Sequence, residues 1–250
     1  MELTVLGSGA CIPTIDRGPS GLALSFGPHL ILFDGGGGSL RPMPRLGLDF
    51  RKIDFHCITH FHPDHVIDLI PLLFAMNYTV DFRRSTPLHI IGPIGMNHFY
   101  EKMKEIFGRW IEAQTYLLSC LEAAESRMDF PGFSVETLPM AHTERSIGFR
   151  VEVKGRSMVY SGDTDYCGNI VRLGREADLL ILECSFPQER KKEGHLTPAL
   201  AGRIAREAKA RQLLLTHFYP VFQGNDIRRE CGTEYSGDIL LATDGMKVEV

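Results

Sequence analysis

The stretch Thr59-His60-Phe61-His62-Pro63-Asp64-His65 places three histidines and one carboxylate within six residues. Imidazole nitrogens and carboxylate oxygens are the atoms that zinc and similar divalent ions bind. His60 and His62 are two positions apart, so their side chains point to the same side of an extended chain. One ion rarely takes four ligands from one short loop. The stretch therefore predicts a site for two ions.

Four short segments, three of them mostly apolar and one (133–138) alternating apolar and polar residues, are each expected to be a strand and lead to candidate ligands. They are 55–58 before the histidine stretch, 133–138 before His142, 158–160 before Asp163, and 213–215 before His217. Ligands that follow strand ends are held by a rigid scaffold and remain accessible. A histidine-rich loop can be simply a polar surface loop, but the repeated strand-and-ligand pattern favours a metal site.

The order His-x-His-x-Asp-His, then an isolated His, an Asp and a final His, resembles the metal signature of the metallo-β-lactamase superfamily. In this chain the signature falls on His60, His62, Asp64, His65, His142, Asp163 and His217. The segments most similar to ribonuclease Z-type phosphodiesterases are 33–36, 160–164, 195–197 and 215–218. The resemblance implies an α/β fold, a four-layer αββα sandwich of two mixed sheets with helices outside. It also implies a metal-dependent hydrolase.

The resemblance distributes the ligands over two divalent ions, with zinc expected first and manganese or iron as alternatives. The first ion is expected on His60, His62, His142 and Asp163, and the second on Asp64, His65, Asp163 and His217. Asp163 is the expected bridge, because each of its two oxygens can face one ion. Such ions lower the pKa of a shared water and clamp the oxygens of a transition state.

Asp64 and His195 are the expected catalytic residues, and Asp34 and Thr197 are expected to support the metal site. His195 precedes an expected helix at 198–209, in which Thr197 is the N-cap. There it could protonate the leaving oxygen or neutralise developing charge. The simpler alternatives are a surface histidine at 195 and an ordinary acidic turn at Asp34, which precedes four glycines.

The remaining pattern is that of a mixed α/β chain. Segments 3–6, 22–26 and 30–33 are expected to form an antiparallel meander, and 64–76 a helix. Segment 97–121 is expected to form one or two helices. Because the ligands extend from residue 60 to 217 and must meet, one domain spanning 1–250 is expected.

Composition excludes several classes of protein. A net charge of −4 is unlike a dedicated nucleic-acid binder. No apolar run approaches the roughly 20 residues of a membrane span, and the N-terminus lacks signal-peptide features. The six cysteines have no paired spacing, which is typical of reduced thiols in a cytoplasmic protein.

The sequence leaves several functions open. The tRNA-maturing enzymes carry a long basic insertion between the isolated His and the bridging Asp, but 142–163 holds only two expected strands and a turn. A small phosphodiester such as a cyclic nucleotide is therefore the expected substrate, with tRNA 3′-end cleavage as the alternative. A lactonase or thioesterase and a non-catalytic metal-binding protein are further alternatives. Iron redox members typically carry Glu where this chain has His62. The family is often dimeric, so a homodimer is an open expectation.

Overall fold

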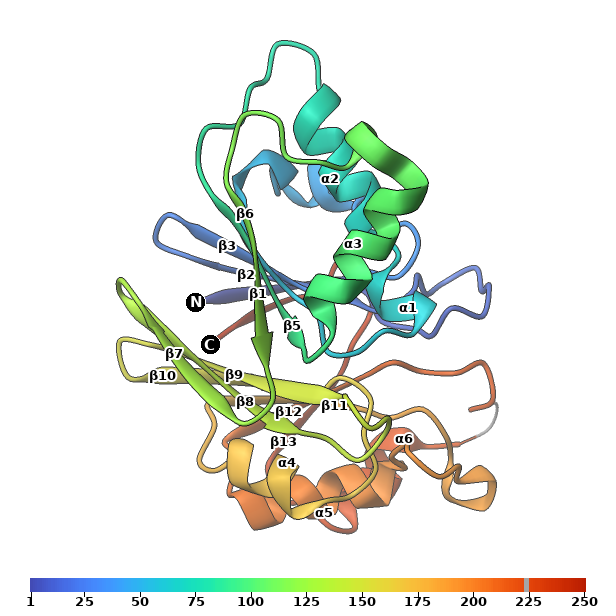
Figure 1. The fold of residues 1–250 in the computed structure, drawn as a ribbon. Helices are drawn as coiled ribbons and strands as arrows, with labels where there is room; N and C mark the ends of the chain where they lie inside the picture. The colour runs from blue at the N-terminus through green and yellow to red at the C-terminus, as the bar shows by residue number, and fades with distance from the viewer. Residues whose placement is uncertain (223–224) are drawn as a thin grey trace.

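Two seven-stranded β-sheets face each other, and each carries helices on its outer side (Figure 1). The computed structural model describes residues 1–222 and 225–250. This arrangement confirms the predicted αββα sandwich. Within the described residues, no helix is both long and apolar enough to cross a membrane.

The first sheet is antiparallel at one side and parallel at the other. Its strands, in spatial order, are β14 (Lys247–Glu249), β1 (Glu2–Gly7), β2 (Gly21–Phe26), β3 (His29–Phe33), β4 (Ile53–Cys57), β5 (Leu88–Pro93) and β6 (Leu118–Ala123). The outer helices of this half are α1 (Pro63–Val66), α2 (Leu69–Tyr78) and α3 (Met96–Phe107). The predicted meander at 3–33 is confirmed as β1, β2 and β3.

The second sheet is built from the later part of the chain and is likewise mixed. Its strands, in spatial order, are β13 (Asp238–Leu241), β12 (Gln212–Thr216), β11 (Leu179–Glu183), β10 (Arg156–Tyr160), β9 (Ile147–Val153), β8 (Phe133–Pro139) and β7 (Ser126–Phe130). It is covered by α4 (Gly168–Leu173), α5 (Pro198–Ala208) and α6 (Ile227–Gly232). Short 3₁₀ helices lie at Met43–Leu46, Phe50–Lys52, Gly108–Trp110 and Gln188–Arg190.

The core between the sheets takes apolar side chains from both of them. Phe33 of β3 and Phe149 of β9 meet edge to face, with ring centroids 5.9 Å apart. A second apolar cluster lies between the first sheet and the helices α2 and α3. Burial of this kind is the main stabilising contribution to folding, and it fixes the two sheets relative to each other.

Two predicted helices differ from the structure. The helix expected over 64–76 is interrupted between α1 and α2, because Asp68 is drawn towards the glycine loop after β3. The Asp68 backbone N–H donates to the Gly35 carbonyl at 2.9 Å, and its carboxylate accepts from the backbone of Gly38 at 2.9 Å. Segment 97–121 is helical only to Phe107, followed by the 3₁₀ turn, and its last residues enter β6. Pairing with β5 outweighs their helical spacing.

Candidate metal centre

The candidate ligands lie in segments that follow strands of both sheets, all at one edge of the sandwich; Asp64 and His65 are in α1 and the others are in loops. Strands β3 and β4 run parallel, and so do β10, β11 and β12, so the loops after them emerge on the same side. Asp34 and His217 adopt left-handed backbone conformations, with φ of 53° and 59°. Non-glycine residues seldom do so, and such strain is concentrated at functional sites.

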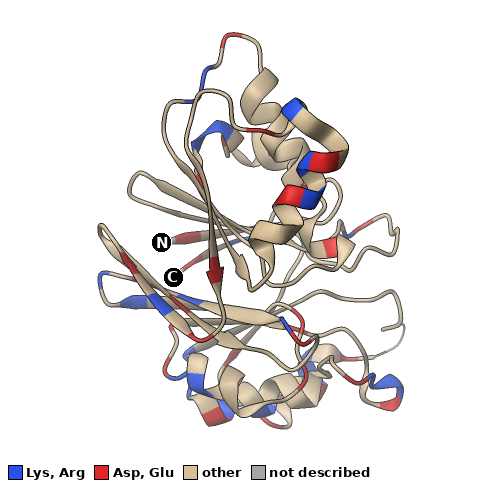
Figure 2. Ribbon diagram, in the orientation of Figure 1, with Lys and Arg blue, Asp and Glu red and all other residues tan. Residues whose placement is uncertain are grey.

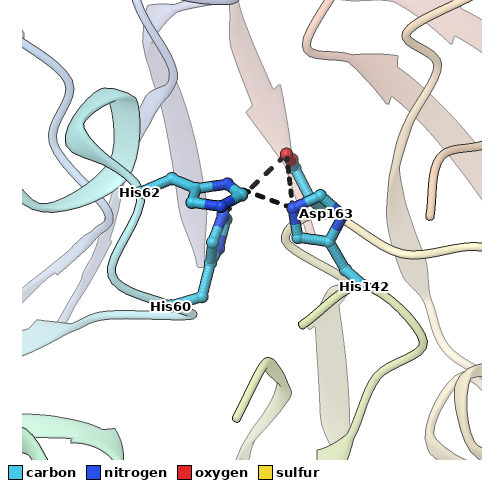
Figure 3. A group of neighbouring side chains, drawn as sticks. All are labelled: His60, His62, His142 and Asp163. Carbon is cyan, nitrogen blue, oxygen red and sulfur yellow. Dashed lines mark hydrogen bonds and ion pairs between the residues drawn. The ribbon is translucent and has the colours of Figure 1, made fainter. Parts of the chain in front are cut away.

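The first ligand group brings together His60, His62, His142 and Asp163, whose ligand atoms all lie within 4.8 Å of one another. Figure 3 shows His60 and His62 facing His142 and the Asp163 carboxylate. Asp163 Oδ2 lies 3.7 Å from His142 Nε2 and 3.9 Å from His60 Nε2. His62 Nδ1 lies 3.1 Å from His142 Nε2.

The second ligand group, formed by Asp64, His65 and His217, lies against the other oxygen of Asp163. Asp163 Oδ1 is 3.4 Å from His65 Nε2 and 3.5 Å from His217 Nε2. Asp64 Oδ2 is 3.4 Å from His217 Nε2. The two oxygens of Asp163 therefore face different groups, as a bridging carboxylate requires.

The atoms at the centre of the two groups lack partners within the described residues. His60 Nε2 and Asp163 Oδ1 are buried and make no hydrogen bond there. Buried polar atoms are costly to leave unpaired, and each one calls for an explanation. A divalent cation satisfies both atoms, and nitrogen and carboxylate oxygen are suitable donors for zinc or manganese. The residues present therefore fit a metal site.

The protonation of three candidate ligands suits a cation, whereas at His65 the charges of Asp163 and Asp34 outweigh burial and raise the pKa, so an ion would have to displace a proton there. Burial lowers the pKa of His60 well below its ordinary value and lowers that of His142, so both imidazoles are neutral and have a lone pair to offer. Burial alone would raise the pKa of Asp163. The imidazoles of His217 and His65 outweigh burial and hold that pKa well below the usual range. The carboxylate is therefore ionised.

Asp34 orients the second ligand group through a hydrogen bond with His65. Its buried carboxylate accepts hydrogen bonds from His65 Nδ1 at 2.7 Å, from the Thr59 backbone N–H at 2.8 Å, and from the Tyr160 hydroxyl at 2.8 Å. Because Nδ1 of His65 donates to Asp34, its Nε2 is the nitrogen turned towards the centre. Partners of this kind orient metal-binding histidines. The structure thus places Asp34 in direct contact with a candidate ligand.

His195 lies at the rim of the centre and is held by Glu183. The distance from His195 Nδ1 to Glu183 Oε1 is 2.8 Å, and from His195 Nδ1 to Asp163 Oδ2 it is 3.9 Å. Burial lowers the pKa of His195, but the hydrogen bond and charge of Glu183 outweigh burial, and the pKa is raised. His195 therefore retains a proton to a higher pH than an ordinary histidine.

Sequence reasoning missed Glu183 and Ser185. The buried Glu183 carboxylate also accepts from the Ser185 hydroxyl at 2.6 Å, and that hydroxyl lies 2.9 Å from His217 Nδ1. Glu183 thus connects His195 and His217. The missed signal was the run Leu179-Leu-Ile-Leu-Glu183, which has the same apolar strand ending in a polar residue as the other ligand segments.

Thr197 is not placed against a candidate ligand. Its hydroxyl accepts from the Leu200 backbone N–H at 3.4 Å and donates to the Gln188 side-chain oxygen at 2.9 Å. The predicted helix at 198–209 is confirmed as α5, with Thr197 as its N-cap. Thr197 therefore fixes the start of α5, two residues after His195.

Known proteins share both this sequence pattern and this fold. The family described as Beta-lactamase superfamily domain matches residues 29–218. The chain belongs to the beta-lactamase superfamily. Within this superfamily, ribonuclease Z of Mycobacterium marinum is 31% identical over 276 aligned positions, covering all of the chain and 99% of the relative. The probable metallo-hydrolase YhfI of Bacillus subtilis is 26% identical, with 98% of each chain covered.

Solved structures of superfamily members agree with these relatives. The crystal structure of the metallo-beta-lactamase fold protein YhfI from Bacillus subtilis superimposes with a TM-score of 0.87 at 26% identity, covering 100% of this chain and 99% of that one. The short form of human tRNase Z gives a TM-score of 0.80 at 28% identity, with the same coverage. This member of the beta-lactamase superfamily is a metallo-hydrolase of the ribonuclease Z and YhfI branch. The fold implies divalent metal ions, for which the cluster of His and Asp side chains around Asp163 is the candidate site.

Proposed function

We propose that this hydrolase cleaves a small phosphodiester, such as a cyclic nucleotide, with two divalent ions held by the seven candidate ligands. The observation that carries the proposal is the pair of Asp163 oxygens, which face different ligand groups. When bound, two such ions supply an activated water at neutral pH and neutralise charge on a phosphoryl transition state. Zinc is the ion proposed first, with manganese or iron as the alternatives.

His195 is the proposed proton donor to the leaving oxygen. Its Nδ1 is engaged by Glu183, so Nε2 is the nitrogen left for a substrate. The raised pKa of His195 keeps this proton bound to a higher pH than in an ordinary histidine. Asp64, at the rim of the second group, is the other proposed catalytic residue, because its carboxylate, 3.4 Å from His217 Nε2, would help to hold the second ion.

The chain is better suited to a small substrate than to tRNA. Between His142 and Asp163 it has only β9, a turn and β10, with no arm. Ribonuclease Z of Myxococcus xanthus aligns over 307 positions with the 250 residues of this chain, whereas YhfI aligns over 247. The chain thus lacks segments that this ribonuclease Z has. Figure 2 shows acidic and basic residues mixed in both halves of the molecule.

tRNA 3′-end cleavage is the second candidate function. It is favoured by the names of two relatives, ribonuclease Z and human tRNase Z. A rate comparison decides between the candidates. Metal-loaded protein is assayed with cyclic nucleotides, bis(p-nitrophenyl) phosphate, a lactone and a precursor tRNA. The small phosphodiesters should be cleaved fastest. Faster cleavage of precursor tRNA would establish the second candidate, and faster cleavage of the lactone would exclude both.

The metal content of Asp163→Ala tests the bridging role separately from turnover. This variant should lose much of its bound metal, measured by elemental analysis after dialysis, because Asp163 alone faces both ligand groups. His89→Ala is the control: His89 lies on β5 and bonds to Ser119, away from the site. Full metal content in Asp163→Ala would show that the carboxylate does not bridge.

A further inference from the structure

A cavity of about 330 Å³ opens beside the candidate ligand His62. It is lined by Phe61, His62, Thr143, Glu144 and Arg145. Because His62 belongs to both the cavity and the first ligand group, a phosphodiester held at the metal centre can extend directly into this space. The cavity is thus placed to receive the part of the substrate next to the scissile phosphate.

One wall of the cavity is a tight turn directly after the ligand His142. The Ser146 backbone N–H donates to the Thr143 carbonyl at 3.2 Å, and the two hydroxyls of these residues lie 2.8 Å apart. Glu144 and Arg145 are the two central residues of this turn. The turn fixes their backbone positions relative to His142, and both side chains line the cavity.

The other wall of the cavity is the Phe61 ring, which packs against a second aromatic ring. Phe61 stacks on Phe99 of α3, with ring centroids 5.0 Å apart and planes at 21°. Gly95, which has a φ of 102°, leaves room for both walls. A Cβ there would lie 2.5 Å from Arg145 Nη1 and 3.7 Å from Phe61 Cε2. The guanidinium of Arg145 therefore passes over Gly95 beside the Phe61 ring.

The two charged side chains of the turn are available to a ligand. Within residues 1–222 and 225–250, neither the Glu144 nor the Arg145 side chain makes a hydrogen bond or an ion pair, and both are exposed. One positive and one negative group side by side do not favour a second phosphate, which Glu144 would repel. They match a neutral, flat group that has both acceptors and donors on its edge.

We propose that this cavity is a nucleobase subsite with a preference for guanine; the proposal rests on the phosphodiesterase function proposed above. The base stacks on Phe61, since nucleobases of every kind stack on aromatic side chains. The fork of Arg145 donates to O6 and N7 of guanine. The Glu144 carboxylate accepts from the N1–H and amino group of the same base. Adenine offers Arg145 only N7 at that edge, so it binds less well.

The test compares bases under conditions that separate binding from turnover. For metal-loaded wild type, kcat and KM are measured with three cyclic nucleotides (3′,5′-cyclic GMP, 3′,5′-cyclic AMP and 3′,5′-cyclic UMP). The same constants are measured with bis(p-nitrophenyl) phosphate, which has no base. Binding of GMP and AMP is measured by calorimetry. Cyclic GMP should give the lowest KM, and GMP should bind more tightly than AMP. Arg145→Met should raise the KM for cyclic GMP roughly tenfold or more, with little change in kcat, and should abolish the preference for guanine.

Matched variants identify the source of any effect. Glu144→Gln should weaken the preference for guanine in the same direction, whereas Arg83→Met, at an exposed arginine in the loop before β5, should have no effect. The loss in Arg145→Met and Glu144→Gln should be clearly larger for cyclic GMP than for bis(p-nitrophenyl) phosphate, which has no base. Equal KM values for the three cyclic nucleotides, or an equal loss for every substrate in Arg145→Met, would overturn the subsite while leaving the phosphodiesterase function intact.

Failure of the proposed function gives a different result. In that case wild type would cleave no phosphodiester, including bis(p-nitrophenyl) phosphate, and calorimetry would decide the subsite alone. Tighter binding of GMP than AMP that disappears in Arg145→Met would support the subsite. Equal binding of both nucleotides, or the same preference in the variant, would overturn it.

Discussion

At the scale of single residues, His195 combines a raised pKa with a position at the rim of the metal centre. His195→Ala should keep its metals and its fold but lose roughly a hundredfold in turnover, the usual effect of removing a general acid or a charge-stabilising donor. The loss should be larger for poor leaving groups, which need a proton most. An equal loss for nitrophenolate and alkoxide leaving groups would show that His195 is not the proton donor.

Glu183→Gln is the companion variant, because it keeps a hydrogen-bond acceptor beside His195 but removes the charge. The pKa of His195 should then fall. Since the proton donor must be protonated to act, the loss of activity on the basic side of the pH profile should begin at a lower pH in this variant than in wild type.

His56 is a buried histidine that stays neutral. Burial lowers its pKa from 6.5 to about 4, while Nε2 lies 3.0 Å from the Asp34 carbonyl. Between these pH values the unfolded chain binds a proton that the folded chain does not. Neutral His56 therefore costs the folded protein nothing above pH 6.5. As the pH falls from 6.5 towards 4, protonation of His56 in the unfolded chain lowers the free energy of unfolding by about 3 kcal/mol.

His56→Gln should remove this part of the pH dependence. Urea unfolding of both proteins at pH 7 and pH 4.5, in the presence of EDTA, measures the effect as the difference between their two pH slopes. The other buried histidines titrate equally in both proteins and cancel. Identical slopes would show that His56 does not titrate between these values.

The sequence indicated the seven candidate ligands because they are of the metal-binding types, follow expected strands and match the metal signature that the chain resembles. It did not single out Glu183 or Ser185: the apolar run before Glu183 is a weak signal, since carboxylates and hydroxyls are common at strand ends and neither residue is part of the metal signature. Their role follows only from parallel pairing of β10, β11 and β12, which brings the end of β11 between Asp163 and His217.

At the scale of elements, α5 and α6 pack closely at Gly202. A Cβ at this position would lie 2.4 Å from the Cys231 carbonyl oxygen of α6. Alanine normally stabilises a helix relative to glycine, by up to about 1 kcal/mol. Here the clash should outweigh that gain, and Gly202→Ala should lower the free energy of unfolding by about 1–3 kcal/mol.

Gly168→Ala is the matched control, because a Cβ there meets nothing within 4 Å at the start of α4. It should be neutral or slightly stabilising in the same urea experiment. Equal free energies of unfolding for the two variants would contradict the prediction. They would show that α5 and α6 can move apart enough to accommodate a Cβ at position 202.

Elements with local determinants were predicted well, and elements that depend on distant partners were not. The opening meander and α5 have alternating or capped sequences, and both are present. The two helix errors occur where another segment decides the outcome: Gly35 and Gly38 for the break at Asp68, and β5 for the strand at 118–121. A sequence pattern contains no information about those partners.

At the scale of the whole molecule, the two sheets share one apolar core, and β14 returns to pair with β1 in the first sheet. We therefore propose one domain over residues 1–250 and expect one cooperative unfolding transition. The fluorescence of Trp110, the single tryptophan, reports on the first half, and far-UV circular dichroism reports on both. Their urea curves should coincide. Two separate transitions would indicate two independently stable units.

The candidate metal centre would take His60, His62, Asp64 and His65 from the loop and helix α1 that follow β4 in the first sheet, and His142, Asp163 and His217 from loops of the second. The geometry of the site therefore depends on how the two sheets are positioned relative to each other. A small slip of one sheet across the other would separate the two oxygens of Asp163 from half of their partners, while each sheet kept its own hydrogen bonds. Metal affinity should accordingly respond to substitutions deep between the sheets, far from any ligand, before those substitutions unfold the protein.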